Sequence, residues 1–277
     1  MRNLFILLLF FITSIYSSAQ LIVPDGFSYA SSKYKAEELD SSNQNFYYQL
    51  SFVRDRKNPQ RKQEILFILE LGKKFSKFTE FNTLKMDSLL EKYSHQSTVG
   101  SKEINEMFNF RTKISTVLVK DLTKEINIFQ DRVKNTYQYE EKQPVFNWKL
   151  EKGIKDIMGH KCNKAHTEYR GRKYTAWYAT DIPINNGPYV FQGLPGLILE
   201  LEDDSKEYHY MAVAIDKNSK SIYLRNEEEI LKVSREQFRK VERSYYENPG
   251  FFTGEAYNQD GNQIKLKPTP YNPIELE

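Results

Sequence analysis

The residues with the clearest capacity for chemistry lie close together in one block of the chain, residues 159–202. This block contains the only cysteine, Cys162, and two of the four histidines, His160 and His166. Imidazole and thiolate groups suit zinc or copper, and a cysteine beside a histidine suits nucleophilic catalysis. On a regular strand the three side chains would share one face, because side chains alternate with a period of two.

The spacing of these residues argues against both kinds of chemistry. At the rise of a strand, His160 and His166 would lie about 20 Å apart, which is too far for one metal ion. Neighbouring positions on the same face lie about 6.5–7 Å apart, which is too far for a direct hydrogen bond. We therefore predict no catalytic residue, no metal and no cofactor, with Cys162 as a buried structural residue. A metal or thiol enzyme centred on this cysteine and a histidine remains an alternative.

Two arginines and three aromatic residues of the same block are candidates for binding. Arg170 and Arg172 flank a glycine in an expected hairpin turn and could bind an anion, or could simply solvate the edge of a sheet. Trp177, Tyr189 and Phe191 flank a proline-rich loop. They could line a hydrophobic or sugar-binding cleft, or they could close one end of the sheet as core.

Glycines and prolines punctuate the rest of the block. A phosphate-binding loop would need a GxxxxGK sequence that opens a helix, whereas an apolar strand is expected after Gly196. Pro195 fixes φ at the second position of a turn and Gly196 accepts a positive φ at the third, which predicts a type II turn. We assign structural roles to Cys162 and to the residues that shape the turns, which are Gly171, Pro183, Gly187, Pro188, Gly193, Leu194, Pro195 and Gly196.

The hexapeptide at 193–198 (GLPGLI), with the cysteine, arginines and aromatic residues before it, resembles the signature of the GLPGLI family, a group of exported bacterial proteins. The resemblance covers about the last two thirds of the chain and includes the ending NPIEL at 272–276. It implies an exported, β-rich protein and assigns no molecular activity. A weaker similarity, to the bowl-shaped N-terminal domain of one type of bacterial peptide N-glycosidase, concerns a non-catalytic part and implies no glycosidase chemistry.

Short alternating segments dominate the chain around this block. Strands are expected at 46–54, 64–71, 75–81, 114–120, 126–133, 136–140, 145–150, 161–169, 173–180, 197–202, 207–215 and 221–225. Helices are expected at 82–93, 101–108 and 234–247, the last with Ser234 and Gln237 as a capping box, and one helical turn at 35–39. Short strands at regular spacing predict an antiparallel meander.

The predicted fold class is therefore mainly β. We expect a large curved antiparallel sheet, half-barrel or bowl-like, with two or three packed helices. The expected parts are a signal peptide at 1–19, a loose leader at 20–43, a single β-rich GLPGLI domain at 44–250 and an extended or disordered tail at 251–277. The tail is assigned from its three prolines, at 268, 270 and 273.

The first residues have the pattern of an export signal. Arg2 precedes nine apolar residues at 4–12, and small residues end at Ala19, after which we expect cleavage. The protein should then be periplasmic, associated with the outer membrane or secreted, with no transmembrane segment in the mature chain. Lysine plus arginine number 40 and aspartate plus glutamate 37, so the charge gives no reason to expect nucleic acid as a partner.

These observations favour a non-enzymatic binding or accessory protein of the cell envelope. Its partner could be an envelope protein, a peptide, a glycan or a lipid. The second hypothesis is a carrier that holds an apolar ligand, such as a lipid or an acyl chain, inside the bowl. The carrier requires a continuous cavity lined by aromatic residues, so the shape of the interior separates these two hypotheses.

Overall fold

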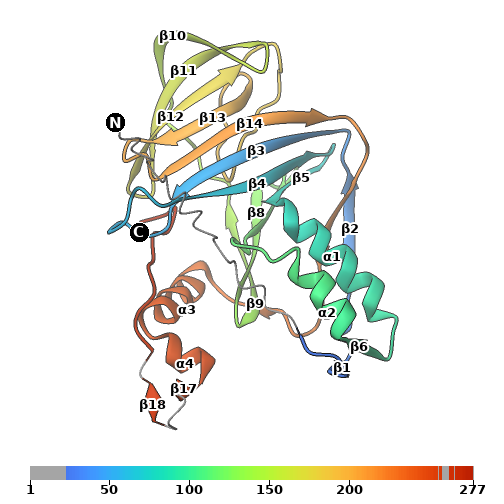
Figure 1. Cartoon of the computed structure of the whole chain (residues 1–277). Coiled ribbons are helices and arrows are strands. Elements are labelled where there is room, and N and C mark those ends of the chain that lie inside the picture. Colours follow the sequence, from blue (N-terminus) through green and yellow to red (C-terminus); the bar gives the residue numbers. More distant parts are fainter. Residues whose placement is uncertain (1–22, 255, 258–261, 265, 277) are drawn as a thin grey trace, which may run out of the picture.

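The computed structural model describes residues 23–254, 256–257, 262–264 and 266–276, so the expected signal peptide at 1–19 lies outside the described residues. Twelve strands form one large open sheet in the order β10-β11-β12-β13-β14-β3-β4-β5-β7-β8-β9-β16 (Figure 1). Neighbouring strands are antiparallel, except that β16 runs parallel to β9. The structure confirms a mainly β protein with a large curved sheet, and it shows that the sheet does not close into a barrel.

Two meanders make up this sheet. The first contains β3 (Gln44–Val53), β4 (Lys62–Leu71), β5 (Phe75–Glu80), β7 (Val117–Asp121), β8 (Ile126–Val133) and β9 (Asn135–Lys142). The second contains β10 (Lys149–Ile157), β11 (His160–Tyr169), β12 (Arg172–Ala179), β13 (Leu197–Asp203) and β14 (Tyr208–Asp216). The short strand β16 (Leu231–Lys232) pairs with β9 and so adds one strand to the edge of the first meander. The meanders join where β14 pairs with β3.

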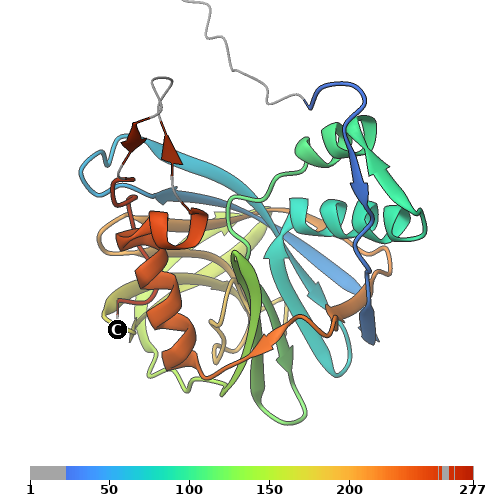
Figure 2. The same cartoon turned by 90° about the horizontal axis from the view of Figure 1, so that it is seen from below.

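Four helices and three two-stranded sheets complete the described part of the chain. The helices are α1 (Phe81–Ser94), α2 (Ser101–Phe108), α3 (Arg235–Glu247) and α4 (Pro249–Thr253). The two-stranded sheets pair β1 (Ser28–Ala30) with β6 (Thr98–Gly100), β2 (Ala36–Ser41) with β15 (Ser221–Arg225), and β17 (Ala256–Tyr257) with β18 (Gln263–Ile264). In Figure 2, α3 and α4 lie on one side of the curved sheet, and α1 and α2 lie on the other.

Alternating apolar residues determine the inner face of the sheet. On β3, Phe46, Tyr48, Leu50 and Phe52 occupy every second position and are 0–6% exposed. Side chains of a strand alternate between its two faces, so these four residues all point into the bowl. They belong to one hydrophobic cluster that also contains residues of the second meander, such as Tyr210, so the two meanders share a core.

The helix expected near the C-terminus is confirmed as α3. The Ser234 side chain accepts a hydrogen bond from the Gln237 N–H, and Gln237 bonds back to the Ser234 N–H, so the capping box is present. Phe238 on this helix is 2% exposed and packs against Tyr139 of the sheet, with ring centroids 5.5 Å apart. This contact packs α3 against β9.

Three expectations about the elements are corrected. Residues 35–39 form no helical turn, because residues 36–41 are strand β2, paired with β15. The strand expected at 145–150 starts later, as β10 from Lys149. The domain does not end at residue 250, because Asn272 and Glu275 are 7% and 2% exposed within the folded body.

None of the described helices is both long and apolar enough to cross a bilayer.

Candidate functional site

The arginine hairpin forms as a tight two-residue turn. Strand β11 ends at Tyr169 and β12 begins at Arg172, so only Arg170 and Gly171 connect them. Their φ angles are 46° and 81°, which is the left-handed region that a type I′ hairpin turn requires at both positions. The structural role assigned to Gly171 is therefore supported by its backbone conformation.

Arg172 binds the protein's own C-terminal segment. Its side chain is 2% exposed and forms ion pairs with Asp203 at 2.8 Å and Glu207 at 2.7 Å. The guanidinium also donates to the side-chain oxygen of Asn272 at 2.6 Å and to the carbonyl of Pro273 at 2.8 Å. Because the guanidinium is buried and its partners are internal, Arg172 offers little to an external anion.

The neighbouring Arg170 also contacts the end of the chain. It forms ion pairs with Glu141 at 3.1 Å and with Glu275 at 3.7 Å. Burial alone would raise the pKa of Glu275, but hydrogen bonds from Arg235 and Tyr189 hold it below its usual value. The two arginines, which were candidates for binding a ligand, thus anchor the NPIEL ending at 272–276.

The structure separates the three aromatic candidates. Phe191 is fully buried, and Tyr189 is 8% exposed, with its hydroxyl donating to Glu275 at 2.8 Å. Trp177 lies on the other face of β12, where the ammonium groups of Lys155 and Lys164 approach its ring within 5.7 and 5.9 Å. Only Tyr189 of the five predicted binding residues lines the cavity described below.

The histidines beside the cysteine point to different partners. His160 contacts Asp181 at 2.7 Å, whereas His166 contacts Glu151 and lies 3.0 Å from the Thr175 hydroxyl. Cys162 is fully buried, and burial raises the pKa of its thiol to about 11. A thiol with this pKa carries little thiolate at neutral pH, which does not favour a nucleophile.

The turn around the GLPGLI hexapeptide differs from the expectation. The residue with a positive φ is Gly193, at 96°, whereas Gly196 has no positive φ, so the predicted conformation of Gly196 is wrong. Gly196 nevertheless has no room for a side chain, because an added Cβ would collide with the carbonyl oxygen of Ala179. At Gly187, an added Cβ would lie 2.8 Å from the Cβ of Ile198.

A buried lysine holds the loop at 181–196, which precedes β13. Lys120 on β7 is 1% exposed and donates to the side-chain oxygen of Asn186 at 2.9 Å and to the carbonyl of Phe191 at 3.4 Å. Asn186 in turn donates to the Ser76 hydroxyl at 2.9 Å. Burial lowers the pKa of Lys120 to about 7. These hydrogen bonds tie the loop at 181–196 to β7 and β5.

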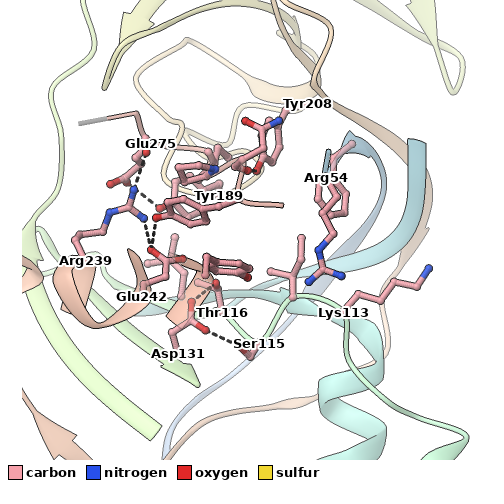
Figure 3. A pocket seen from close by; sticks show the side chains of 18 of the residues that line it. Arg54, Lys113, Ser115, Thr116, Asp131, Tyr189, Tyr208, Arg239, Glu242 and Glu275 are labelled. Carbon is pink, nitrogen blue, oxygen red and sulfur yellow. Dashed lines mark hydrogen bonds and ion pairs between the residues drawn. The ribbon is translucent and has the colours of Figure 1, made fainter. Parts of the chain in front are cut away.

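A cavity of about 150 Å³ lies inside the bowl, between β3–β5, α3 and the C-terminal segment (Figure 3). An engineered cavity of about this volume is known to hold a benzene molecule, so the space suits a single six-membered ring. Aromatic side chains form much of its wall: Phe52, Phe67, Phe78, Tyr139, Tyr189, Tyr208, Tyr210, Phe238, Tyr246 and Tyr271.

Three carboxyl groups line the same cavity: that of Glu275, whose ion pairs are described above, and those of Asp131 and Glu242. Asp131 on β8 accepts hydrogen bonds from the hydroxyls of Ser115 and Thr116, as Figure 3 shows, and burial raises its pKa. Glu242 on α3 accepts from Arg239 at 2.5 Å and from the Tyr271 hydroxyl at 2.9 Å, both through Oε2. Burial raises the pKa of Glu242 to about 7. Displaced carboxyl pKa values are frequent at functional sites.

The exposed lining residues show where the cavity meets solvent. They are Arg54, directly after β3, Lys113, in the segment before β7, and Pro270. Figure 3 shows Arg54 and Lys113 on the same side of the cavity, across from Arg239 and Glu275. The mouth therefore carries two cationic side chains.

This cavity could not be predicted from the sequence. Its charged residues come from the position after β3, the segment before β7, strand β8, helix α3 and the C-terminal segment, which are far apart in the chain. One signal was present: Glu242 follows the buried Phe238 by four residues, so this acid lies on the apolar face of an otherwise amphipathic helix.

Comparisons with known proteins give a partial match to one family and a likeness in fold to solved structures. A family described as "Protein of unknown function (Porph_ging)" matches residues 99–200, which is less than half of the chain. No curated protein matches. The structure of PNGF-II in the C2 space group is similar over 75% of this chain and 34% of that chain, with 12% identity and a TM-score of 0.51.

A second PNGF-II structure, in the P21 space group, is similar over 73% of this chain and 33% of that chain, with 14% identity and a TM-score of 0.48. The chain spans about a third of the PNGF-II chain that it matches. At such identities the likeness concerns the fold alone. The likeness in fold to the structure in the C2 space group supports the weaker of the two resemblances drawn from the sequence.

Proposed function

We propose that this chain is a non-enzymatic binding protein of the cell envelope, and that it holds one ring-sized group of its partner molecule in the aromatic cavity. The observation that carries this proposal is the cavity itself, of about 150 Å³, with aromatic walls, the carboxyl groups of Asp131 and Glu242 and a mouth open to solvent. Apolar walls with a few fixed polar groups are typical of small-molecule sites. Membership of the GLPGLI family and export after cleavage at Ala19 are part of this proposal.

The two alternative functions receive less support. The aromatic wall of the cavity is a feature that the lipid carrier also requires, but a volume of about 150 Å³ has room for about one ring and not for an acyl chain, and charged side chains line it. An enzyme centred on Cys162 needs an accessible thiolate, whereas burial raises the pKa of this thiol to about 11 and Cys162 does not line the cavity.

Native mass spectrometry of the protein purified from its own cells tests the proposal. Ile114 lines the cavity, and the substitution Ile114→Phe places a ring in the space that a ligand would occupy. Ile154, on β10, is 75% exposed outside the cavity, so Ile154→Phe is the matched control. We expect a small-molecule adduct on the parent and on the control, and none on Ile114→Phe.

An adduct that persists in Ile114→Phe, or a parent protein with no adduct, would contradict the proposal. An adduct with the mass of a fatty acid would instead favour the carrier. The same spectrum tests export, because cleavage after Ala19 would leave a protein with the mass of the chain that begins at Gln20.

A further inference from the structure

Two cations at the mouth of the cavity form no close ion pair within the described part of the chain, and the nearby Glu80 carboxylate attracts only one of them, Lys113. The Lys113 ammonium donates to the backbone carbonyl of Glu64 at 3.1 Å, and the Arg54 guanidinium is hydrogen-bonded to the Tyr246 hydroxyl. Across the described residues, neither side chain takes part in an ion pair. Two like charges at one opening repel each other, and an anion placed between them would relieve this repulsion.

The charged groups deeper in the cavity are arranged differently. Arg239 is satisfied by Glu242 and by the backbone carbonyl of Glu275, at 2.5 and 2.7 Å. The hydrogen bonds to Glu242 all use Oε2, so Oε1 has no donor among the described residues. Asp131 accepts three hydrogen bonds, from Ser115, Thr116 and the Arg132 N–H, and a carboxylate has about four acceptor positions. The interior therefore retains acceptors that suit hydroxyl donors.

We infer that the ligand is an acidic sugar, with its pyranose ring in the aromatic cavity and its carboxylate between Arg54 and Lys113. The apolar face of a pyranose ring packs on aromatic rings, its hydroxyls donate to the free acceptors of Asp131 and Glu242, and its carboxylate pairs with the two cations. A plain aromatic ring would use neither the inner acceptors nor the cations. This inference rests on the binding function proposed above and names the class of its ligand.

A matched pair of ligands tests the inference by isothermal titration calorimetry. Methyl β-glucuronoside and methyl β-glucoside differ only by the carboxylate in place of a hydroxymethyl group. We expect the parent protein to bind the glucuronoside at least about tenfold more tightly. The preference should shrink in 0.5 M NaCl, because salt screens charges at an exposed mouth.

The double variant Arg54→Gln/Lys113→Gln should lose the preference. The control is Lys161→Gln/Lys217→Gln, which removes two exposed cations that do not line the cavity and should keep the preference. Equal affinity for the two sugars in the parent, or a preference that survives in the Arg54/Lys113 variant, would overturn the inference.

Binding of neither sugar would also overturn the acidic-sugar inference. The proposed binding function has its own test, because native mass spectrometry of the Ile114→Phe variant depends on no assumption about the ligand. An uncharged adduct that is lost in Ile114→Phe would therefore support the function and refute the ligand class.

Discussion

Single residues of the signature block act through close packing more than through special backbone angles. Gly196 shows this most clearly, because its φ is ordinary and yet a Cβ would collide with the carbonyl oxygen of Ala179. We expect Gly196→Ala to lower the free energy of unfolding by about 1–3 kcal/mol, measured by urea denaturation. Gly250→Ala is the control, since its Cβ would meet only Leu266 at 4.0 Å. An unchanged urea midpoint for Gly196→Ala would show that the backbone around Ala179 can move away from the added Cβ without loss of stability.

Glu242 should make the stability of the protein depend on pH. Burial raises its folded-state pKa to about 7, whereas a glutamate in the unfolded chain has a pKa of about 4.3. Between these values the folded state retains a proton that the unfolded chain has released, so stability falls as pH rises through this window and changes no further above it. In Glu242→Gln, which keeps an acceptor for Arg239, this contribution is absent.

The measurement is the difference in unfolding free energy between the parent and Glu242→Gln from pH 4 to 8. We expect the parent to lose stability relative to the variant between about pH 4.3 and 7. Because Asp131 is present in both proteins, its own titration should largely cancel. Parallel pH profiles would refute the displaced pKa of Glu242 and weaken its role in the cavity.

At the scale of elements, the C-terminal segment behaves as an internal strap. The Asn272 side chain accepts from Arg172 and donates to the carbonyl of Val53, each at 2.6 Å, and so joins β12 to the end of β3. Asn272→Ala leaves two buried groups without this partner, and each such group costs about 1–3 kcal/mol. We therefore expect a loss of about 2 kcal/mol or more in urea denaturation. Thr269→Ala, at an exposed position of the same segment, should change little.

The sequence predicted those elements whose pattern agrees with their tertiary role. The alternation on β3 and β8 and the capping box of α3 were sufficient to identify them. Strand β2 has the sequence AEELDS, which favours a helix locally, and only its pairing with β15, distant in the chain, makes it a strand. Strand β10 is an exposed edge with little apolar alternation, so its start could not be located.

The same reasoning explains why the cavity could not be predicted. A cavity is defined by distances between elements, and periodicity within one element contains no such information. The cavity brings together residues from four distant parts of the chain, which are Arg54, Asp131, Glu242 and Tyr271. The block with the most distinctive sequence, 159–202, instead has a structural role. Its Arg172 binds Asn272 of the C-terminal segment, and its Asn186 accepts a hydrogen bond from Lys120.

At the scale of the whole molecule, one strand pair unites the two meanders. Strand β14 pairs with β3 along nearly its whole length, from Tyr208 opposite Phe52 to Asp216 opposite Asn45. The rings of Phe52 and Tyr208 stack across this junction at 5.7 Å, and the Tyr48 hydroxyl donates to the carbonyl of Ile198 at 2.7 Å. Because the core is continuous across the junction, we expect the meanders to unfold together.

The positions of the tryptophans make this expectation testable. Both lie in the part of the chain from Trp148 onward: Trp148 directly precedes β10 and Trp177 is on β12, so tryptophan fluorescence reports mainly the second meander. Far-ultraviolet circular dichroism reports the strands of both. In urea the two signals should change at one midpoint, as a two-state transition requires. A fluorescence transition at lower urea would mean that the second meander opens first, and the shared cavity would then be lost before the first meander unfolds.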